Sequence, residues 1–201
     1  GEAPRKKEMK AAAISMAKKA ERLGVDIHMN TKVTPEMIEE IKPHTVMNAI
    51  GAESIIPPIP GVDKAFVKDS HDVLDGKAEA TGNVVVIGGG MVGMETAEYL
   101  AEKGAKVSVL EMLPDICSDM GTTRKICMGE EIQKSGIIPV TSVKVTEIGD
   151  NVVIGEKDGE KVEFPCDTAV LAIGAKKRDG SALAETCYKN GIGYFEIGDA
   201  A

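Results

Sequence analysis

The sequence predicts an α/β fold built around a parallel sheet, and three observations support this prediction. Apolar, β-branched runs alternate along the chain with segments whose apolar residues recur at helical spacing. Glycine or proline separates most of these segments. A glycine-rich turn, Gly88 to Gly93, joins one such run to one such helical segment. This alternation is typical of parallel strands that are connected by helices.

The N-terminal third predicts two helices, two strands and a connector. Gly24 ends the first helical pattern as a left-handed C-cap, and Thr34-Pro35 supplies an N-cap and a first-turn proline for the second. In order, the predicted segments are a helix over Met9–Leu23, an alternating strand over Val25–Met29, a short helix that Pro43 ends, a buried strand over Thr45–Ile50, and a stiff connector over Pro57–Gly61.

The rest of the sequence predicts the strands and helices of the parallel sheet, together with three antiparallel strands. Asp158-Gly159 is a hairpin turn sequence between two alternating segments. In order, we predict a strand over Val84–Ile87, a helix over Met91–Lys103, a strand over Lys106–Leu110, a helix over Thr122–Lys134, a strand over Ile137–Val140, three antiparallel strands over Val143–Ile148, Val152–Glu156 and Lys161–Phe164, and a buried strand over Thr168–Ile173.

Short sequence matches relate the two parts of the chain. Gly24 is followed eight residues later by Lys32-Val33-Thr34, and Gly136 eight residues later by Lys144-Val145-Thr146. Two eight-residue segments, which open at Thr45 and Thr168, end in the same tetrapeptide, Ala-Ile-Gly-Ala. Because the matches keep their order, we infer two nested nucleotide-binding units, of which the first lacks a glycine-rich turn. We predict a Rossmann-like parallel sheet with helices on both faces, plus an antiparallel meander. The predicted domains are residues 81–175, inserted between residues 1–80 and 176–201.

The glycine turn carries the chemistry. Its glycines permit a tight turn (Gly88), close approach of a pyrophosphate (Gly90) and close helix packing (Gly93), while Gly89, Met91 and Val92 complete the sequence. The helix that follows offers N–H groups and a positive dipole to phosphates. Glu111 lies 18 residues after Gly93, at the end of the next strand.

This spacing predicts an NAD(H) site, in which Glu111 accepts hydrogen bonds from the adenosine ribose hydroxyls. Its charge would repel a 2′-phosphate, and no arginine follows it, so NAD is favoured over NADP. The alternative is a turn without a ligand, with Glu111 as a solvated strand end.

Composition excludes several other classes. A net charge of −8 opposes a nucleic-acid partner. No apolar run approaches the roughly 20 residues of a membrane span, and no signal-peptide pattern is present, so we expect a soluble, cytoplasmic protein. The histidines and the four cysteines (Cys117, Cys127, Cys166 and Cys187) have neither zinc-ligand nor C-x-x-C spacing. We therefore expect no metal site, and we expect the cysteines to be reduced and mostly packing thiols.

Four segments carry a resemblance to a known family: Ala49–Ala52, Ile56–Gly61, Gly88–Glu95 and Ile197–Ala200. Over essentially all 201 residues, the chain resembles the C-terminal, nucleotide-binding half of the Old Yellow Enzyme-like NADH:flavin oxidoreductases, the group of 2-enoate and 2,4-dienoyl-CoA reductases. More broadly, it is similar to flavoproteins in which an NAD domain is inserted into an FAD-type domain.

The resemblance implies further site residues and partners. Beside NAD it places Ile173 and Gly174, with Val145 at the adenine and Glu95 towards the nicotinamide; for FAD or FMN in a longer parent it implies Gly51, Gly198 and Asp199. It also implies a flavin-binding barrel and an iron–sulfur cluster upstream of Gly1. Glu95 has an alternative interpretation, because with Glu98 and Glu102 it forms a helical stripe that is typical of a solvated face.

Together these expectations describe the NAD(H)-binding part of a flavin-dependent oxidoreductase, in which NADH is positioned for hydride transfer to flavin. We find no constellation for a catalytic acid, base or nucleophile, so we expect this chain alone to be inactive. Two alternatives stay open: part of a pyridine-nucleotide oxidase or disulfide-type reductase, and a non-catalytic NAD-binding or sensing module. Paired redox cysteines, which would favour the disulfide-type reductase, are absent from the sequence.

Overall fold

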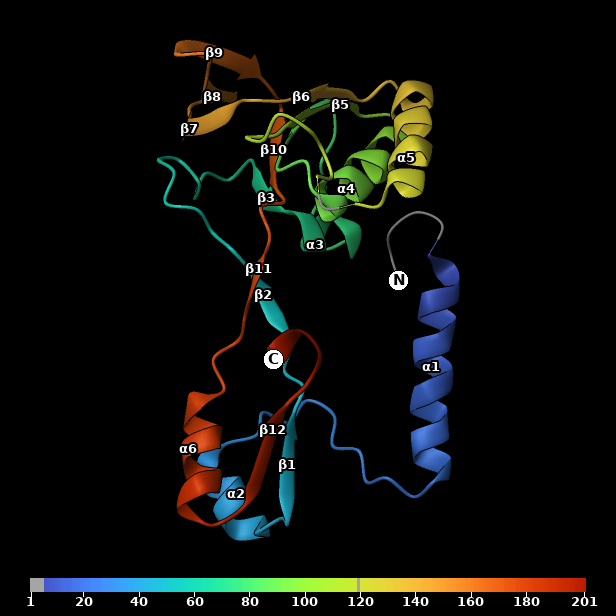
Figure 1. Ribbon diagram of the computed structural model, residues 1–201, viewed down its shortest axis with the longest axis vertical. Coiled ribbons are helices and arrows are strands. Elements are labelled where there is room, and N and C mark those ends of the chain that lie inside the picture. The colour runs from blue at the N-terminus through green and yellow to red at the C-terminus, as the bar shows by residue number, and fades with distance from the viewer. Residues whose placement is uncertain (1–5, 119) are drawn as a thin grey trace. The chain divides into compact units, whose positions relative to one another are not determined.

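The computed structural model describes residues 6–118 and 120–201 (Figure 1). The chain forms two compact units. The larger unit comprises Gly1–Ala13 and Ser54–Gly174, and the smaller comprises Ile14–Glu53 and Ala175–Ala201. Most of the larger unit is therefore inserted in sequence between two parts of the smaller one.

The larger unit contains a five-stranded parallel sheet in the order β3-β10-β4-β5-β6. The strands are β3 (Val67–Asp69), β10 (Thr168–Leu171), β4 (Asn83–Ile87), β5 (Lys106–Leu110) and β6 (Ile138–Val140). Helix α4 (Met91–Glu102) connects β4 to β5, and α5 (Thr122–Ser135) connects β5 to β6. The chain leaves β4 towards β5 on one side, while β10 pairs with β4 on the other. Ligands bind at such a switch point in open α/β sheets, beyond the carboxyl ends of the strands.

Alternate residues of β4 enter two different cores. Val84 and Val86 pack with residues of α4, α5 and the short helix α3 (Ser70–Leu74). Val85 and Ile87 pack on the opposite face against an antiparallel sheet, which is formed by β7 (Lys144–Ile148), β8 (Val152–Lys157) and β9 (Glu160–Pro165) (Figure 1). All four side chains are at most 4% exposed. The predicted Rossmann-like sheet with an antiparallel meander is confirmed, and in this unit the meander covers the second face in place of helices.

The smaller unit has a parallel pair of strands, β1 (Thr45–Asn48) and β12 (Gly193–Glu196). Helices α2 (Pro35–Ile41) and α6 (Ser181–Lys189) pack with them around Ile38, Cys187 and Ile192. A second pair joins β2 (Ala52–Ser54) to β11 (Ala175–Lys177), and a short turn of helix, η1, covers Gly198–Ala200. Helix α1 covers Lys7–Arg22.

One strand prediction was wrong in this part of the chain, and a second was right in its start but wrong in its end and its burial. Residues 25–29 form no strand, because no described strand pairs with them, and their alternating Val25, Ile27 and Met29 are 54%, 43% and 76% exposed. The predicted buried strand over Thr45–Ile50 ends at Asn48, and its Met47 is 65% exposed. Helices α2 and α6 cover only the sheet face that carries Val46 and Tyr194, so the alternate face stays open to solvent.

The described helices include none that combines the length and the apolarity needed to cross a bilayer.

Candidate functional site

The glycine turn between β4 and α4 is shaped by two close approaches. Gly88 has φ +109°, a conformation that side chains disfavour, and its N–H donates to the Leu110 carbonyl at 2.8 Å. Gly93 lies in the first turn of α4, where a Cβ would run into the Gly88 carbonyl oxygen. Both glycines are therefore required by the protein's own packing.

Gly90 differs, because no contact among the described residues requires a glycine there. Its backbone is extended (φ −73°, ψ −176°), and a Cβ would meet no atom within 4 Å. Gly90 is the N-cap of α4, which has no side-chain cap and no acidic residue in its first turn. The positive end of the helix is thus left uncapped by side chains, as suits a phosphate.

Glu111 follows β5 and lies against the turn. Its Oε2 accepts from the Gly89 N–H at 2.7 Å, and its Oε1 accepts from the Leu113 N–H at 2.8 Å. A carboxylate oxygen has two lone pairs, so both oxygens keep capacity for a further donor. The carboxylate is therefore held in place by backbone amides and can still accept hydrogen bonds from a ligand.

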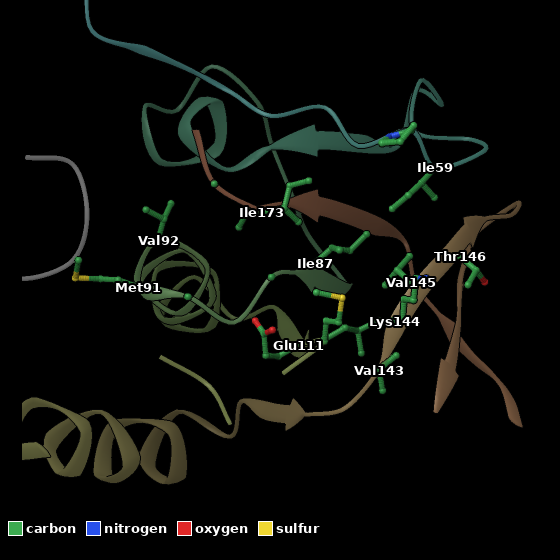
Figure 2. A pocket seen from close by; sticks show the side chains of 17 residues that line it. Ile59, Ile87, Met91, Val92, Glu111, Val143, Lys144, Val145, Thr146 and Ile173 are labelled. Atoms are coloured by element: carbon green, nitrogen blue, oxygen red, sulfur yellow. The ribbon is translucent and has the colours of Figure 1, made fainter. Parts of the chain in front are cut away.

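A cavity of about 900 Å³ opens at the turn. Figure 2 shows Met91 and Val92 at one end of it, Val143 and the first residues of β7 (Lys144 to Thr146) at the other, and Glu111 and Ile173 between them. Its lining is mostly apolar, and the charged side chains in it are those of Glu111 and Lys144. The lining residues are Pro58, Ile59, Ile87, Gly88, Gly90, Met91, Val92, Leu110, Glu111, Met112, Val143, Lys144, Val145, Thr146, Ala172, Ile173 and Gly174.

The structure brings eight of the residues singled out from the sequence to this cavity. They are Gly88, Gly90, Met91, Val92, Glu111, Val145, Ile173 and Gly174. Gly89 and Gly93 support the turn without being among the lining residues. The volume of the cavity and its mostly apolar lining suit a ligand that has an anionic group beside the turn and apolar rings along the walls.

Glu95 lies elsewhere. It is a buried residue of α4, absent from the cavity lining, and its Oε1 lies 2.5 Å from the Lys6 Nζ. The solvated stripe considered for Glu95 and Glu98 is wrong, since both residues are only 8% exposed.

Several lining residues were missed from the sequence. Ile59 belongs to the proline-rich connector, and Met112 is 63% exposed directly after Glu111. Lys144 and Thr146 flank Val145 on β7. A signal for these two existed, because the Lys-Val-Thr triplet is part of the internal sequence match.

The remaining predicted residues belong to the smaller unit. Gly51 follows β1, and Gly198 and Asp199 follow β12, so all three lie beyond the carboxyl ends of two paired parallel strands. Gly51 and Gly198 have positive φ values of +73° and +63°. The strand ends are linked where the Ile197 N–H donates to the Asn48 carbonyl at 2.9 Å. This is the sheet edge at which α/β proteins bind ligands.

Within the described residues, the cavity lining includes no histidine, cysteine or serine. The four cysteines are free thiols, and three of them are buried. This agrees with the expectation that most of them are packing residues, and Cys127 is the exposed one. The site can thus bind and orient a ligand, but it presents no nucleophile of these kinds.

Comparison with known proteins gives consistent matches. Residues 36–197 match the pyridine nucleotide-disulphide oxidoreductase family. Bilirubin reductase from Mediterraneibacter gnavus (strain CC55_001C) is 41% identical over 173 residues, which cover 86% of this chain and 27% of that protein. NADH oxidase from Thermoanaerobacter brockii is 41% identical over 184 residues, which cover 89% of this chain and 28% of that protein.

A solved structure extends the likeness to the whole fold. The complex of 2-naphthoyl-CoA reductase with 2-naphthoyl-CoA superimposes with a TM-score of 0.89 at 28% identity, covering 99% of this chain and 30% of that chain. This chain therefore spans less than a third of the length of each of these relatives. The resemblance to flavin oxidoreductases that was stated from the sequence is confirmed at the level of the family. The chain belongs to the pyridine nucleotide-disulphide oxidoreductase family, whose members bind NAD(P)H and FAD.

Proposed function

We propose that this chain is the NAD(H)-binding part of a flavin-dependent oxidoreductase and that it positions NADH in an enoate or dienoyl-CoA reductase-like enzyme. The observation that carries the proposal is the uncapped N-terminus of α4 at Gly90, which borders an apolar cavity beside the Glu111 carboxylate. When bound, NADH would supply a hydride and a flavin would accept it.

Each part of the cavity has a role in this proposal. The N–H groups at the start of α4 bind the pyrophosphate, for which the open space at Gly90 leaves room. Glu111 accepts from the adenosine ribose hydroxyls, and Val145 packs beside the adenine. Ile173 and Gly174 line the cavity with Val92 and contact the nicotinamide half. No proton transfer is assigned to these residues.

The smaller unit is proposed to contribute to a flavin site in the longer parent. Gly51, Gly198 and Asp199 contact the flavin nucleotide in this assignment, because they share one sheet edge. Residues 176–201 and the part of residues 1–80 that lies in the smaller unit then belong to the FAD-type domain. Residues 81–175 belong to the NAD domain, whose sheet and core also include β3 and α3 from residues 67–74, so the boundary expected at residue 80 lies too late in the sequence. A flavin-binding barrel, with an iron–sulfur cluster, is proposed upstream in the same polypeptide.

The reductase assignment draws support from 2-naphthoyl-CoA reductase, which acts on a CoA thioester as its name states. The second candidate is a pyridine-nucleotide oxidase, which the 41% identity to NADH oxidase favours. Steady-state assays of the parent enzyme with NADH separate the two. We expect anaerobic reduction of an enoyl-CoA, whereas turnover with oxygen as the preferred acceptor would contradict the reductase assignment.

The cofactor preference is tested with Glu111→Ala in the 201-residue chain. We expect wild type to bind NADH more tightly than NADPH, and the variant to lose most of this preference, because both the ribose acceptor and the repelling charge are gone. Nicotinamide fluorescence titrations measure both affinities. Glu102→Gln is the control, since it removes an exposed carboxylate from the last turn of α4. An unchanged NADH:NADPH ratio in Glu111→Ala would contradict the role of Glu111.

A further inference from the structure

We propose that Glu111 is also a positioning residue, which fixes the glycine turn in the shape that binds any dinucleotide, whether or not the ligand has ribose hydroxyls. This inference rests on the proposed NADH site. It goes beyond it, because the role acts through Gly89 rather than through a contact with the ligand.

The two peptide groups that flank Gly89 are each held by the segment that follows β5. The Gly89 N–H donates to the Glu111 Oε2 at 2.7 Å. The Gly89 carbonyl accepts from the Cys117 N–H at 2.8 Å. Segment 111–117 therefore holds the turn at its second residue, next to Gly90, the N-cap of α4.

Packing reinforces these hydrogen bonds. A Cβ on Gly89 would lie 2.9 Å from the Glu111 Cβ and 3.0 Å from the Ile116 Cγ2, so both side chains rest directly on the Gly89 backbone. The second position of a G-x-G-x-x-G turn has no assigned requirement for glycine. Here a larger residue would displace Glu111 or Ile116.

The Glu111 carboxylate is itself anchored at its second oxygen. Oε1 accepts from the Leu113 N–H at 2.8 Å, while the Glu111 N–H and carbonyl bond to Val140 and Val143. The turn is thus tied through one side chain to the edge of the sheet. Hydrogen bonds to a charged group are stronger than neutral ones, so loss of the carboxylate should release the turn.

A positioning role and a role as ribose acceptor alone predict different effects of removing the Glu111 carboxylate. If Glu111 only accepts from ribose, its removal leaves unchanged the affinity for an NADH analogue whose adenosine ribose lacks both hydroxyls. If Glu111 also positions the turn, the amides at the start of α4 are misplaced for the pyrophosphate, and the analogue binds more weakly as well.

The experiment uses the 201-residue chain as wild type, Glu111→Ala, Glu111→Gln and the control Glu102→Gln. Affinities for NADH and for the 2′,3′-dideoxyadenosine analogue of NADH are measured by nicotinamide fluorescence. We expect Glu111→Ala to lower the affinity for the analogue by about tenfold, which is the effect of losing one charge-assisted hydrogen bond. Glu111→Gln keeps one acceptor oxygen, so we expect an intermediate loss.

Amide hydrogen exchange in the ligand-free chain provides the second readout. We expect the amides of Gly89 and Cys117 to exchange about tenfold faster in Glu111→Ala than in wild type. The exchange rates of β4 in this variant, and all rates in the control variant, should stay unchanged. A change of less than about threefold in the analogue's affinity, or unchanged exchange at Gly89, would overturn the positioning role. If wild type fails to bind NADH, the proposed function fails, while the exchange comparison still decides whether Glu111 braces the turn.

Discussion

Gly90 is the residue at which folding and ligand binding make different demands. Among residues 6–118 and 120–201, no atom lies within 4 Å of a Cβ built on Gly90, and its backbone is extended, so alanine or serine fits without strain. A bound pyrophosphate would occupy that space. Gly90→Ser introduces a side chain that is a good N-cap, so we expect the variant to keep the melting temperature of the chain. We expect its affinity for NADH to fall by about tenfold or more.

Gly93→Ala is the matched comparison for this prediction. Its Cβ would meet the Gly88 carbonyl oxygen, so we expect a lower melting temperature whether or not NADH is present. Thermal unfolding and fluorescence titration of both variants check the pair. Full NADH affinity in Gly90→Ser would contradict binding at this turn.

Cysteine reactivity provides a residue-scale test of the packing. Burial, with a smaller effect of Asp167, raises the pKa of the Cys166 thiol to about 11, and burial also raises the pKa of Cys187. Both stay protonated at pH 8, and Cys117 is 2% exposed. We therefore expect only the exposed Cys127 to react quickly with a thiol reagent at pH 8. Fast reaction of a second thiol before denaturation would contradict the burial of the other three cysteines.

At the residue scale, the glycine spacing in its strand-turn-helix context predicted the turn and Glu111, and both border the cavity. The contact between Glu111 and Gly89 was not predictable, since it depends on the path of segment 111–117 back over the turn. Lys144 and Thr146 were missed because a strand's alternation does not tell which of its residues border a cavity.

At the scale of elements, the meander packs as a structural layer. Ile148 of β7 is 1% exposed within the core that also contains Val85 and Val153. We expect Ile148→Ala to lower the free energy of unfolding of the larger unit by about 2–5 kcal/mol. Urea denaturation followed by circular dichroism measures the change.

Ile138→Ala on β6 is the control, because that side chain is 60% exposed and its loss should cost about 0.5 kcal/mol or less. Equal effects of the two substitutions would mean that the meander does not cover the sheet.

The elements that were predicted correctly had strong local signals. The hairpin between β8 and β9 has Asp158-Gly159 at its turn, and β4 is a β-branched run leading into glycine. Helix α6 and strand β12 were not predicted, because their short segments lack such signals. The strand expected over Val25–Met29 failed for a different reason: its alternation is real, but a strand also needs a neighbour to satisfy its backbone.

At the scale of the whole molecule, the order of the sequence matches anticipated an inserted unit. The structure has one, since Ser54–Gly174 lies in sequence between Ile14–Glu53 and Ala175–Ala201, the two parts of the smaller unit. Sequence order alone could not reveal which segments pack together. Strand β3 is one example, because it precedes the glycine turn in sequence yet joins the larger unit's sheet beside β10.

An equilibrium titration of the purified 201-residue chain with NADH, followed by nicotinamide fluorescence, tests the central claim most directly. The account predicts saturable binding of one NADH per chain by a colourless preparation, and a marked loss of affinity in Gly90→Ser. A chain that binds no NADH at millimolar concentration, or a preparation that is yellow with bound flavin, would contradict it.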